Sequence, residues 1–206
     1  MKSNSLLIRM KSEDAGMRIE ADRIERSTER LESFTRSILN YASSSATVNQ
    51  GRAEFCARAA LEDCVREFFP ARAADIAIAP GSGPAVIRGD RAKLGQVYLN
   101  LIRNSFEAGA RKVAVSFSGE AGILRIRLED DGRGCPEAEL PSLGKPFYTT
   151  RKEQGGTGLG IAISRAIIEG FGGILSYQSL RAYGNGSAGM AASIELPSAT
   201  PIASNA

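Results

Sequence analysis

The chain has 206 residues, of which 43% are hydrophobic and 24% charged, a composition typical of a soluble protein with one large domain, or one domain plus an appendage. Its formal net charge of +3 comes from 26 basic and 23 acidic residues, and this balance argues against a nucleic-acid-binding protein. Because the sequence contains no histidine, histidine metal ligands and histidine general bases are excluded within this chain.

The three cysteines, Cys56, Cys64 and Cys135, show neither paired metal-ligand spacing nor a disulfide framework, which favours a reducing compartment. No apolar run reaches membrane-spanning length, and no signal peptide is visible. We therefore expect a cytoplasmic protein, attached to a membrane only if sequence upstream carries an anchor.

Residues 15–42 predict a long amphipathic helix. Four apolar side chains recur at every seventh position, and charged residues fill the gaps between them; the four are Met17, Ile24, Leu31 and Ile38. Such a repeat favours a helix that dimerises with a partner helix, although a surface helix packed on its own domain is the alternative. Residues 43–50 are small and polar and are typical of a linker.

The next segment predicts short strands and one helix. A strand is expected near residues 52–56, a helix over about 59–69 that Pro70 ends, and strands at 75–79 and 86–87 around a turn at 80–84. Asp90 is then the expected N-cap of a helix of about twenty residues. The predicted buried stripe of that helix is Leu94, Val97, Tyr98, Leu101, Ser105 and Ala108.

Two amides lie one helical turn apart at the border of this stripe. At about 100° per residue, Asn100 and Asn104 fall on one line, with Glu107 close to it. In most helices such residues are ordinary surface residues. The alternative is that they point into a cleft as ligands of a cation or a water.

Apolar and other residues alternate with a period of two in residues 113–117 and 124–128, a pattern that predicts a β-hairpin with one buried face. Continuing the alternation places Asp130 on the same side as Leu128, whereas Asp131 points the other way. A carboxylate on the buried side is costly without a partner, so Asp130 is a candidate functional residue. Gly132 and Gly134 would then admit a ligand to the backbone.

A polar segment, residues 149–154, leads into Gly156–Gly160 and then into a helix with apolar side chains at Ile161, Ile163, Ala166 and Ile167. Glycines before a helix N-terminus suit a phosphate, although such loops alone are a weak signal and also occur as plain flexible connections. Phe171–Gly173 should end this helix. Residues 174–179 and 190–196 predict two closing strands.

Four segments, in this order, resemble motifs of bacterial sensor histidine kinases. Asn100–Asn104 resembles the N box, Asp130–Gly134 the D-x-G-x-G box, Pro146–Arg151 the F box and Gly156–Gly160 the second glycine box. The resemblance covers about residues 50–197. It implies an α+β fold, the Bergerat-type two-layer sandwich, in which a mixed sheet is covered by helices on one face.

The resemblance divides the chain into three parts. Residues 1–47 would be part of the dimerisation and phosphotransfer domain, residues 48–197 the catalytic ATP-binding domain, and residues 198–206 a disordered tail. The acceptor histidine of the family would lie upstream, since this chain has none. Truncation is the simplest account, and a natural protein that phosphorylates another chain is the alternative. In either case no autophosphorylation of this chain on histidine is expected.

The resemblance also implies site roles. Asp130 would accept the adenine amino group, Gly132 and Gly134 would let the backbone approach the base and ribose, and Asn104 would bind Mg²⁺ through its amide oxygen. Asn100 would support the metal or an ordered water, and residues 149–154 would form a lid. The candidate phosphate contacts are Lys145, Thr150, Arg151, Lys152, Gly156, Thr157, Gly158, Leu159 and Gly160.

The implied activity is transfer of the ATP γ-phosphoryl group to a histidine outside this chain, for relay to an aspartate of a response regulator receiver domain. The intact protein would be a homodimer through the helical segment. Two alternatives remain at this point: a serine protein kinase of the anti-sigma type, and a nucleotide-binding or dimerisation module without kinase activity. The F box and the heptad helix argue against the first, and the presence of Asn104 and Asp130 against the second.

Overall fold

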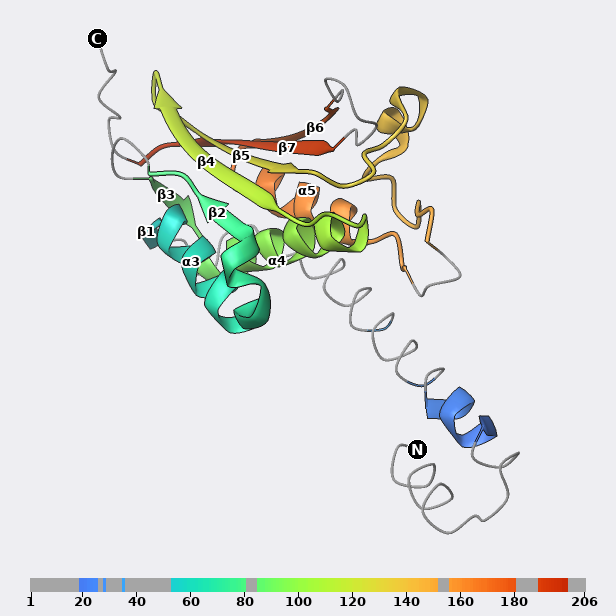
Figure 1. Cartoon of the computed structure of the whole chain (residues 1–206). Helices are drawn as coiled ribbons and strands as arrows, with labels where there is room; N and C mark the ends of the chain where they lie inside the picture. Colours follow the sequence, from blue (N-terminus) through green and yellow to red (C-terminus); the bar gives the residue numbers. More distant parts are fainter. Residues whose placement is uncertain are drawn as a thin grey trace.

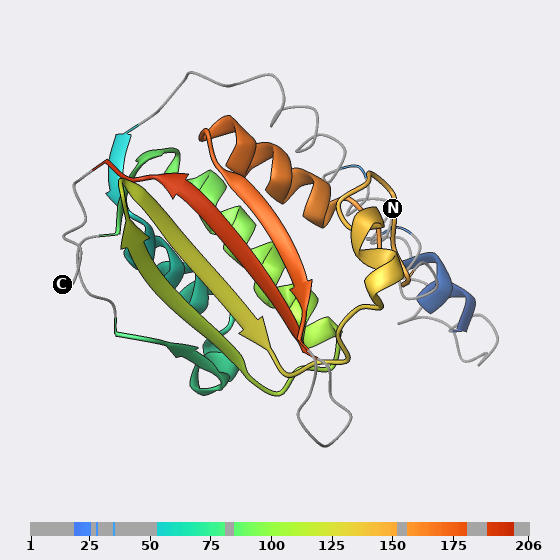
Figure 2. The same cartoon turned by 90° about the horizontal axis from the view of Figure 1, so that it is seen from above.

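The computed structural model of the chain describes residues 19–25, 28, 35, 53–80, 85–151, 156–180 and 189–199. Its largest unit is a five-stranded sheet with helices packed on one face, so that sheet and helices form two layers (Figures 1 and 2). The predicted α+β sandwich is therefore confirmed.

The large sheet has the strand order β2-β4-β5-β7-β6. The strands β2 (Ile76–Ile78) and β4 (Val113–Glu120) run parallel, whereas β5 (Ile123–Asp130), β7 (Met190–Pro197) and β6 (Ile174–Ser179) continue the sheet in antiparallel pairs. A second sheet pairs β1 (Ala53–Cys56) with β3 (Val86–Gly89). Sequence alone predicted these strands but not their division into two sheets.

The β4–β5 hairpin confirms the predicted alternation. The side chains of Val113, Val115 and Phe117 are buried, and those between them are exposed. The hairpin turns on Ala121 and Gly122, whose φ angles of 50° and 79° are the left-handed values that a tight two-residue turn requires. This register carries Asp130 to the end of β5 on the face that the helices cover.

Three helices cover that face: α3 (Ala57–Phe68), α4 (Arg91–Glu107) and α5 (Gly160–Gly170). Asp90 caps α4 as predicted, because its Oδ1 accepts hydrogen bonds from the amides of Ala92 at 2.9 Å and Lys93 at 3.2 Å. Short 3₁₀ helices, η1 (Pro70–Asp75) and η2 (Glu137–Ser142), were not predicted. The core is a single apolar cluster between the helices and the sheet.

The predicted buried face of α4 is largely confirmed. Five of the six residues are buried, but Ala108 lies past the helix end and is half-buried, and Ile102, which was missed, is fully buried. The helix predicted after the glycine box is confirmed as α5; of its four apolar residues named above, Ile163 and Ile167 are buried, and Ile161 and Ala166 are half-buried. The buried side chains of α5 are Ala162, Ile163, Ser164, Ile167 and Ile168.

Helix α5 ends as predicted at Phe171–Gly173. The amide of Gly172 donates to the carbonyl of Glu169 at 2.9 Å, and that of Gly173 donates to Ile168 at 2.9 Å. Gly172 has a φ of 81°, the left-handed conformation that lets the chain leave a helix in this way. The strand β6 then follows directly against α5.

The N-terminal region is described over residues 19–25, 28 and 35, all of which are helical. Ile24, one of the heptad positions, is 51% exposed. The other heptad positions, the predicted linker 43–50, the turn at 81–84 and the tail beyond 199 lie outside the described residues, so the division into domains stays a prediction. Among the described helices, none combines the length and apolar character needed to cross a membrane.

Candidate functional site

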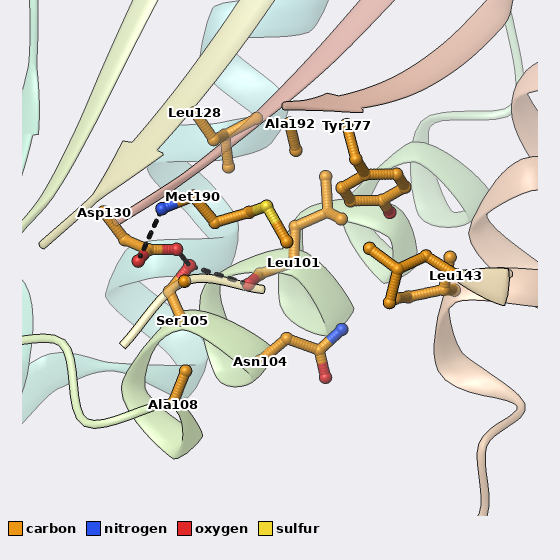
Figure 3. A pocket seen from close by; sticks show the side chains of 12 residues that line it. Leu101, Asn104, Ser105, Ala108, Leu128, Asp130, Leu143, Tyr177, Met190 and Ala192 are labelled. Atoms are coloured by element: carbon orange, nitrogen blue, oxygen red, sulfur yellow. Dashed lines mark hydrogen bonds between the residues drawn. The ribbon is translucent and has the colours of Figure 1, made fainter. Parts of the chain in front are cut away.

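A pocket opens between α4 and the ends of β5, β7 and β6 (Figure 3). It encloses about 540 Å³ when the open space at its mouth is included. Most of the wall is apolar, and the polar residues that line it are Asn104, Ser105, Asp130 and Tyr177. The apolar wall includes Leu101, Leu128, Leu143, Ile161, Met190 and Ala192.

Asp130 is the carboxylate of this pocket. Its Oδ2 accepts a hydrogen bond of 2.8 Å from the hydroxyl of Ser105, and its Oδ1 accepts from the amides of Gly132 at 2.9 Å and Met190 at 3.3 Å. Three donors from three different segments therefore fix the carboxylate. A carboxylate offers about four lone-pair positions, so it retains capacity for a ligand donor such as an amino group.

Asp131 points away from the pocket, as the alternation predicts. Its Oδ1 accepts from the backbone amides of Arg111 at 2.7 Å and Lys112 at 2.9 Å, and thereby ties the end of β5 to the loop before β4. These hydrogen bonds, that of Lys112 most of all, lower the pKa of the Asp131 carboxyl.

This lowered pKa predicts a pH-dependent stability. Because the folded pKa lies below the ordinary value of 3.8, the ionised carboxylate stabilises the fold above that pH, and the contribution is lost as the pH falls through the folded pKa. Asp131→Asn has no charge to lose. Urea denaturation should therefore show a stability gap between wild type and Asp131→Asn at neutral pH that closes below pH 3.8; a gap that stays constant across this range would contradict the prediction.

The two amides of α4 have different surroundings. Asn104 is half-buried and lines the pocket on the helix side, opposite the sheet (Figure 3). The amide nitrogen of Asn100 instead donates to the carbonyl of Gly160 at 3.1 Å and to the hydroxyl of Ser164 at 3.3 Å, so this side chain joins α4 to the first turn of α5. Asn104 is thus placed to contact a ligand directly, whereas Asn100 positions the start of α5.

Two glycines follow Asp130, and close contacts require the first of them. A Cβ atom at Gly132 would lie 2.9 Å from Oδ1 of Asp130 and 3.2 Å from the carbonyl oxygen of Ala108. Gly134 has a φ of 68° and lines the pocket. The predicted approach of ligand to backbone is therefore geometrically possible at Gly134, while Gly132 holds the carboxylate.

Two residues with left-handed backbone join the F box (Pro146–Arg151) to the second glycine box (Gly156–Gly160) by a hydrogen bond. Phe147 has a φ of 65°, which is unusual for a bulky residue, and its amide donates to the carbonyl of Gly158 at 3.1 Å. Gly158 has a φ of 69°, and a Cβ there would lie 2.8 Å from the carbonyl oxygen of Phe147. Strained backbone held by its surroundings is common at binding sites.

The described part of the predicted lid is anchored at its base. The amide of Gly156 donates to the carbonyl of Arg151 at 3.0 Å, and the amide of Arg151 donates to the hydroxyl of Thr149 at 3.1 Å. The Arg151 guanidinium forms an ion pair with Glu107, one turn beyond Asn104 on α4. Arg151 is therefore held beside the Asn104 end of the pocket.

The remaining predicted phosphate contacts surround this region. Thr150 accepts a long hydrogen bond of 3.4 Å from Arg133, and the hydroxyl of Thr157 accepts one of 3.4 Å from the amide of Leu159. Leu159 is fully buried, so only its backbone is available to a ligand. Lys145 is exposed and contacts Ser142, and Lys152 lies outside the described residues.

Sequence reasoning missed two polar residues of the pocket. Ser105 had been recognised only as part of a buried stripe, although a hydroxyl within an apolar stripe is itself a signal that a polar partner lies nearby. Tyr177 gave no signal, because its place beside the pocket depends on the pairing of β6 with β7.

No cluster of three or more histidine, cysteine or acidic side chains occurs within the part of the chain that the structure describes. The donor set therefore does not suit a metal ion held by protein alone. A single amide oxygen, that of Asn104, fits a Mg²⁺ ion that takes most of its oxygen ligands from phosphates and water.

Residues 89–200, more than half of the chain, match the family model described as "Histidine kinase-, DNA gyrase B-, and HSP90-like ATPase". Sporulation kinase C of Bacillus subtilis is 38% identical over 96 residues, which are 46% of this chain and 22% of that protein. Sensor protein FixL of Bradyrhizobium diazoefficiens is 34% identical over 122 residues, 57% of this chain and 23% of that protein. The chain thus spans less than a quarter of the length of these curated relatives.

Solved structures show the same fold. The mycobacterial sensor histidine kinase MprB superposes with a TM-score of 0.61 at 23% identity, covering 71% of this chain and 97% of that one. Full-length ShkA, solved in complex with AMPPNP, gives a TM-score of 0.72 at 23% identity over 97% of this chain and 42% of that one. Together with the sequence matches, the fold and the pocket show that the chain belongs to the histidine kinase-, DNA gyrase B- and HSP90-like ATPase family.

Proposed function

We propose that this chain is the ATP–Mg²⁺-binding catalytic module of a sensor histidine kinase. It would transfer the γ-phosphoryl group of ATP to a histidine that lies outside this chain. The observation that carries the proposal is the pairing, in one pocket, of a fixed carboxylate, Asp130, with a half-buried amide, Asn104. The relatives identified by sequence are named as sporulation and sensor kinases, which favours this activity over others of the ATPase family.

The adenine end of the nucleotide would lie at Asp130. An ionised carboxylate accepts a hydrogen bond from the exocyclic amino group of adenine but would face the carbonyl oxygen of guanine, which is unfavourable. Ser105 and the amides of Gly132 and Met190 hold the carboxylate in place before the ligand arrives, so little ordering is needed on binding.

The phosphate end would lie where α4, the lid base and α5 meet. Asn104 would hold Mg²⁺ through its amide oxygen, and the ion, when bound, would neutralise charge on the phosphates. Arg151, held by Glu107 beside Asn104, would contact phosphate oxygens, and backbone amides between Thr157 and Gly160 would do the same. Catalysis would then consist mainly of positioning and charge neutralisation.

In the intact protein we infer a homodimer through the N-terminal helix and relay of the phosphoryl group to a response regulator receiver domain. Residues 1–47 would be the helical segment, residues 48–197 the catalytic domain and the last nine residues a tail. A cytoplasmic location fits this role.

The test is phosphotransfer in trans. The chain is incubated with labelled ATP, Mg²⁺ and a separate helical fragment that carries the acceptor histidine of a sensor kinase. We expect label on the fragment that is lost in acid and retained in base, as for phosphohistidine. Acid-stable label would indicate a serine kinase instead, and saturable ATP binding without transfer to any fragment would indicate a nucleotide-binding module.

A further inference from the structure

The hydroxyl group of Tyr177 is buried and has no hydrogen-bond partner among the described residues. The structure describes three tyrosines, and the other two are satisfied: Tyr98 donates to the carbonyl of Ala57 at 3.1 Å, and Tyr148 to the carboxylate of Glu139 at 3.1 Å. Buried hydroxyl groups are nearly always paired, so an exception calls for an explanation. The explanation must lie in what surrounds this hydroxyl.

Tyr177 lines the same pocket as Asp130 (Figure 3). Its hydroxyl end lies toward Leu143, on the side of the pocket away from Asp130. Leu143 is held in place by Arg165, whose guanidinium donates to its carbonyl at 3.1 Å, and the Nε of Arg165 is a second buried donor without a partner. Leu143 is therefore fixed in place beside the Tyr177 hydroxyl.

The strand register sets the spacing between Tyr177 and Asp130. Leu128 of β5 pairs with Ala192 of β7, which pairs with Tyr177 of β6, so that one row of side chains crosses the pocket floor. Asp130 leaves β5 on the same face, two residues beyond Leu128. Tyr177 is thus attached two strands from Leu128, about 9.5 Å at the backbone, and Asp130 lies about 7 Å further along β5. The small side chain of Ala192 lies between them on the pocket floor.

Burial raises the pKa of the Tyr177 hydroxyl well above its ordinary value, so this group is neutral at physiological pH and able to donate a hydrogen bond. As a donor, the Tyr177 hydroxyl requires a hydrogen-bond acceptor. In an adenine nucleotide the ring nitrogens N1, N3 and N7 are acceptors, and N3 lies opposite the exocyclic amino group.

We propose that Tyr177 is a specificity-determining residue that donates a hydrogen bond to the N3 edge of the adenine whose amino group Asp130 accepts, directly or through one water. The inference rests on the proposed nucleotide binding and extends it. The adenine ring is then recognised at two opposite edges, by the carboxylate of Asp130 on β5 and the hydroxyl of Tyr177 on β6.

Binding of adenosine, 3-deazaadenosine and 7-deazaadenosine, measured by calorimetry, tests the proposal. In the wild type we expect 3-deazaadenosine to bind roughly fivefold more weakly than adenosine, the size of one neutral hydrogen bond. In Tyr177→Phe this difference should disappear, while any penalty for 7-deazaadenosine stays as in the wild type. The matched control is Tyr98→Phe. It removes a buried hydroxyl that lies outside the pocket and donates to the carbonyl of Ala57 at 3.1 Å, so the weaker binding of 3-deazaadenosine relative to adenosine should remain.

The outcomes separate this inference from the proposed function. Equal binding of adenosine and 3-deazaadenosine by the wild type, or an undiminished penalty in Tyr177→Phe, would overturn the role of Tyr177 while leaving nucleotide binding intact. Absence of binding for every nucleoside and for ATP would instead overturn the proposed function, and with it the inference. Because the readout is a ratio between ligands for one variant, a loss of stability in Tyr177→Phe would not imitate the expected result.

Discussion

Asp130→Asn should weaken ATP binding by roughly 100-fold, since it removes a charged acceptor that is worth about 1.5–3 kcal/mol and presents a donor to the adenine amino group. The amide oxygen of the asparagine can still accept from Gly132 and Met190, while its NH₂ group replaces the oxygen that accepts from Ser105. Isothermal calorimetry with ATP and Mg²⁺ measures the loss.

The matched control for this prediction is Asp131→Asn, the identical change at the next residue. Asp131 faces away from the pocket and accepts from Arg111 and Lys112, so its substitution should leave ATP affinity within about twofold of the wild type. A similar loss of affinity in both variants would show that the effect comes from the end of β5 as a whole. ATP binding by Asp130→Asn at wild-type affinity would exclude the carboxylate as the adenine contact.

Gly189→Ala should destabilise the protein by about 3 kcal/mol and lose nucleotide binding with it. Gly189 precedes β7, and a Cβ atom there would overlap the backbone carbonyl of Asp130. Neither partner can move easily, because the Gly189 carbonyl accepts from the amide of Leu180 at 2.8 Å and Asp130 ends the paired strand β5. Chemical denaturation followed by circular dichroism gives the stability.

The matched control for Gly189→Ala is Gly95→Ala. Gly95 lies inside α4, and a Cβ atom there would meet nothing within 4 Å. Alanine is the better helix former, so this variant should gain about 0.5–1 kcal/mol. If Gly189→Ala were as stable as the wild type, the close approach of the chain to Asp130 would not be a constraint on the fold.

Local patterns were sufficient to predict most elements of this fold. The period of two over β4 and β5 fixed which side chains are buried, and it correctly separated the orientations of Asp130 and Asp131. The Asp90 cap and the glycine stop of α5 were likewise predictable, since both depend on residues close in sequence.

Contacts between distant segments were not predictable in this way. That Asn100 turns to Gly160 while Asn104 faces the pocket depends on how α4 packs against α5, which the single helix pattern does not contain. That Ile161 borders the pocket likewise depends on how α5 packs. Tyr177 reaches the pocket only through a register across three strands.

Asn104 and Ser105 are consecutive residues of α4. Asn104 faces the open pocket, whereas the Ser105 hydroxyl donates a hydrogen bond to Asp130. On the proposed assignment, the single helix α4 thus sets the distance between the part of the site that binds the metal and the part that binds the base. Since a helix rises about 1.5 Å per residue and does not stretch, the distance between the two ends cannot adapt to a longer or shorter ligand. Selectivity for ligand length would then be a property of α4 itself, independent of how the lid closes.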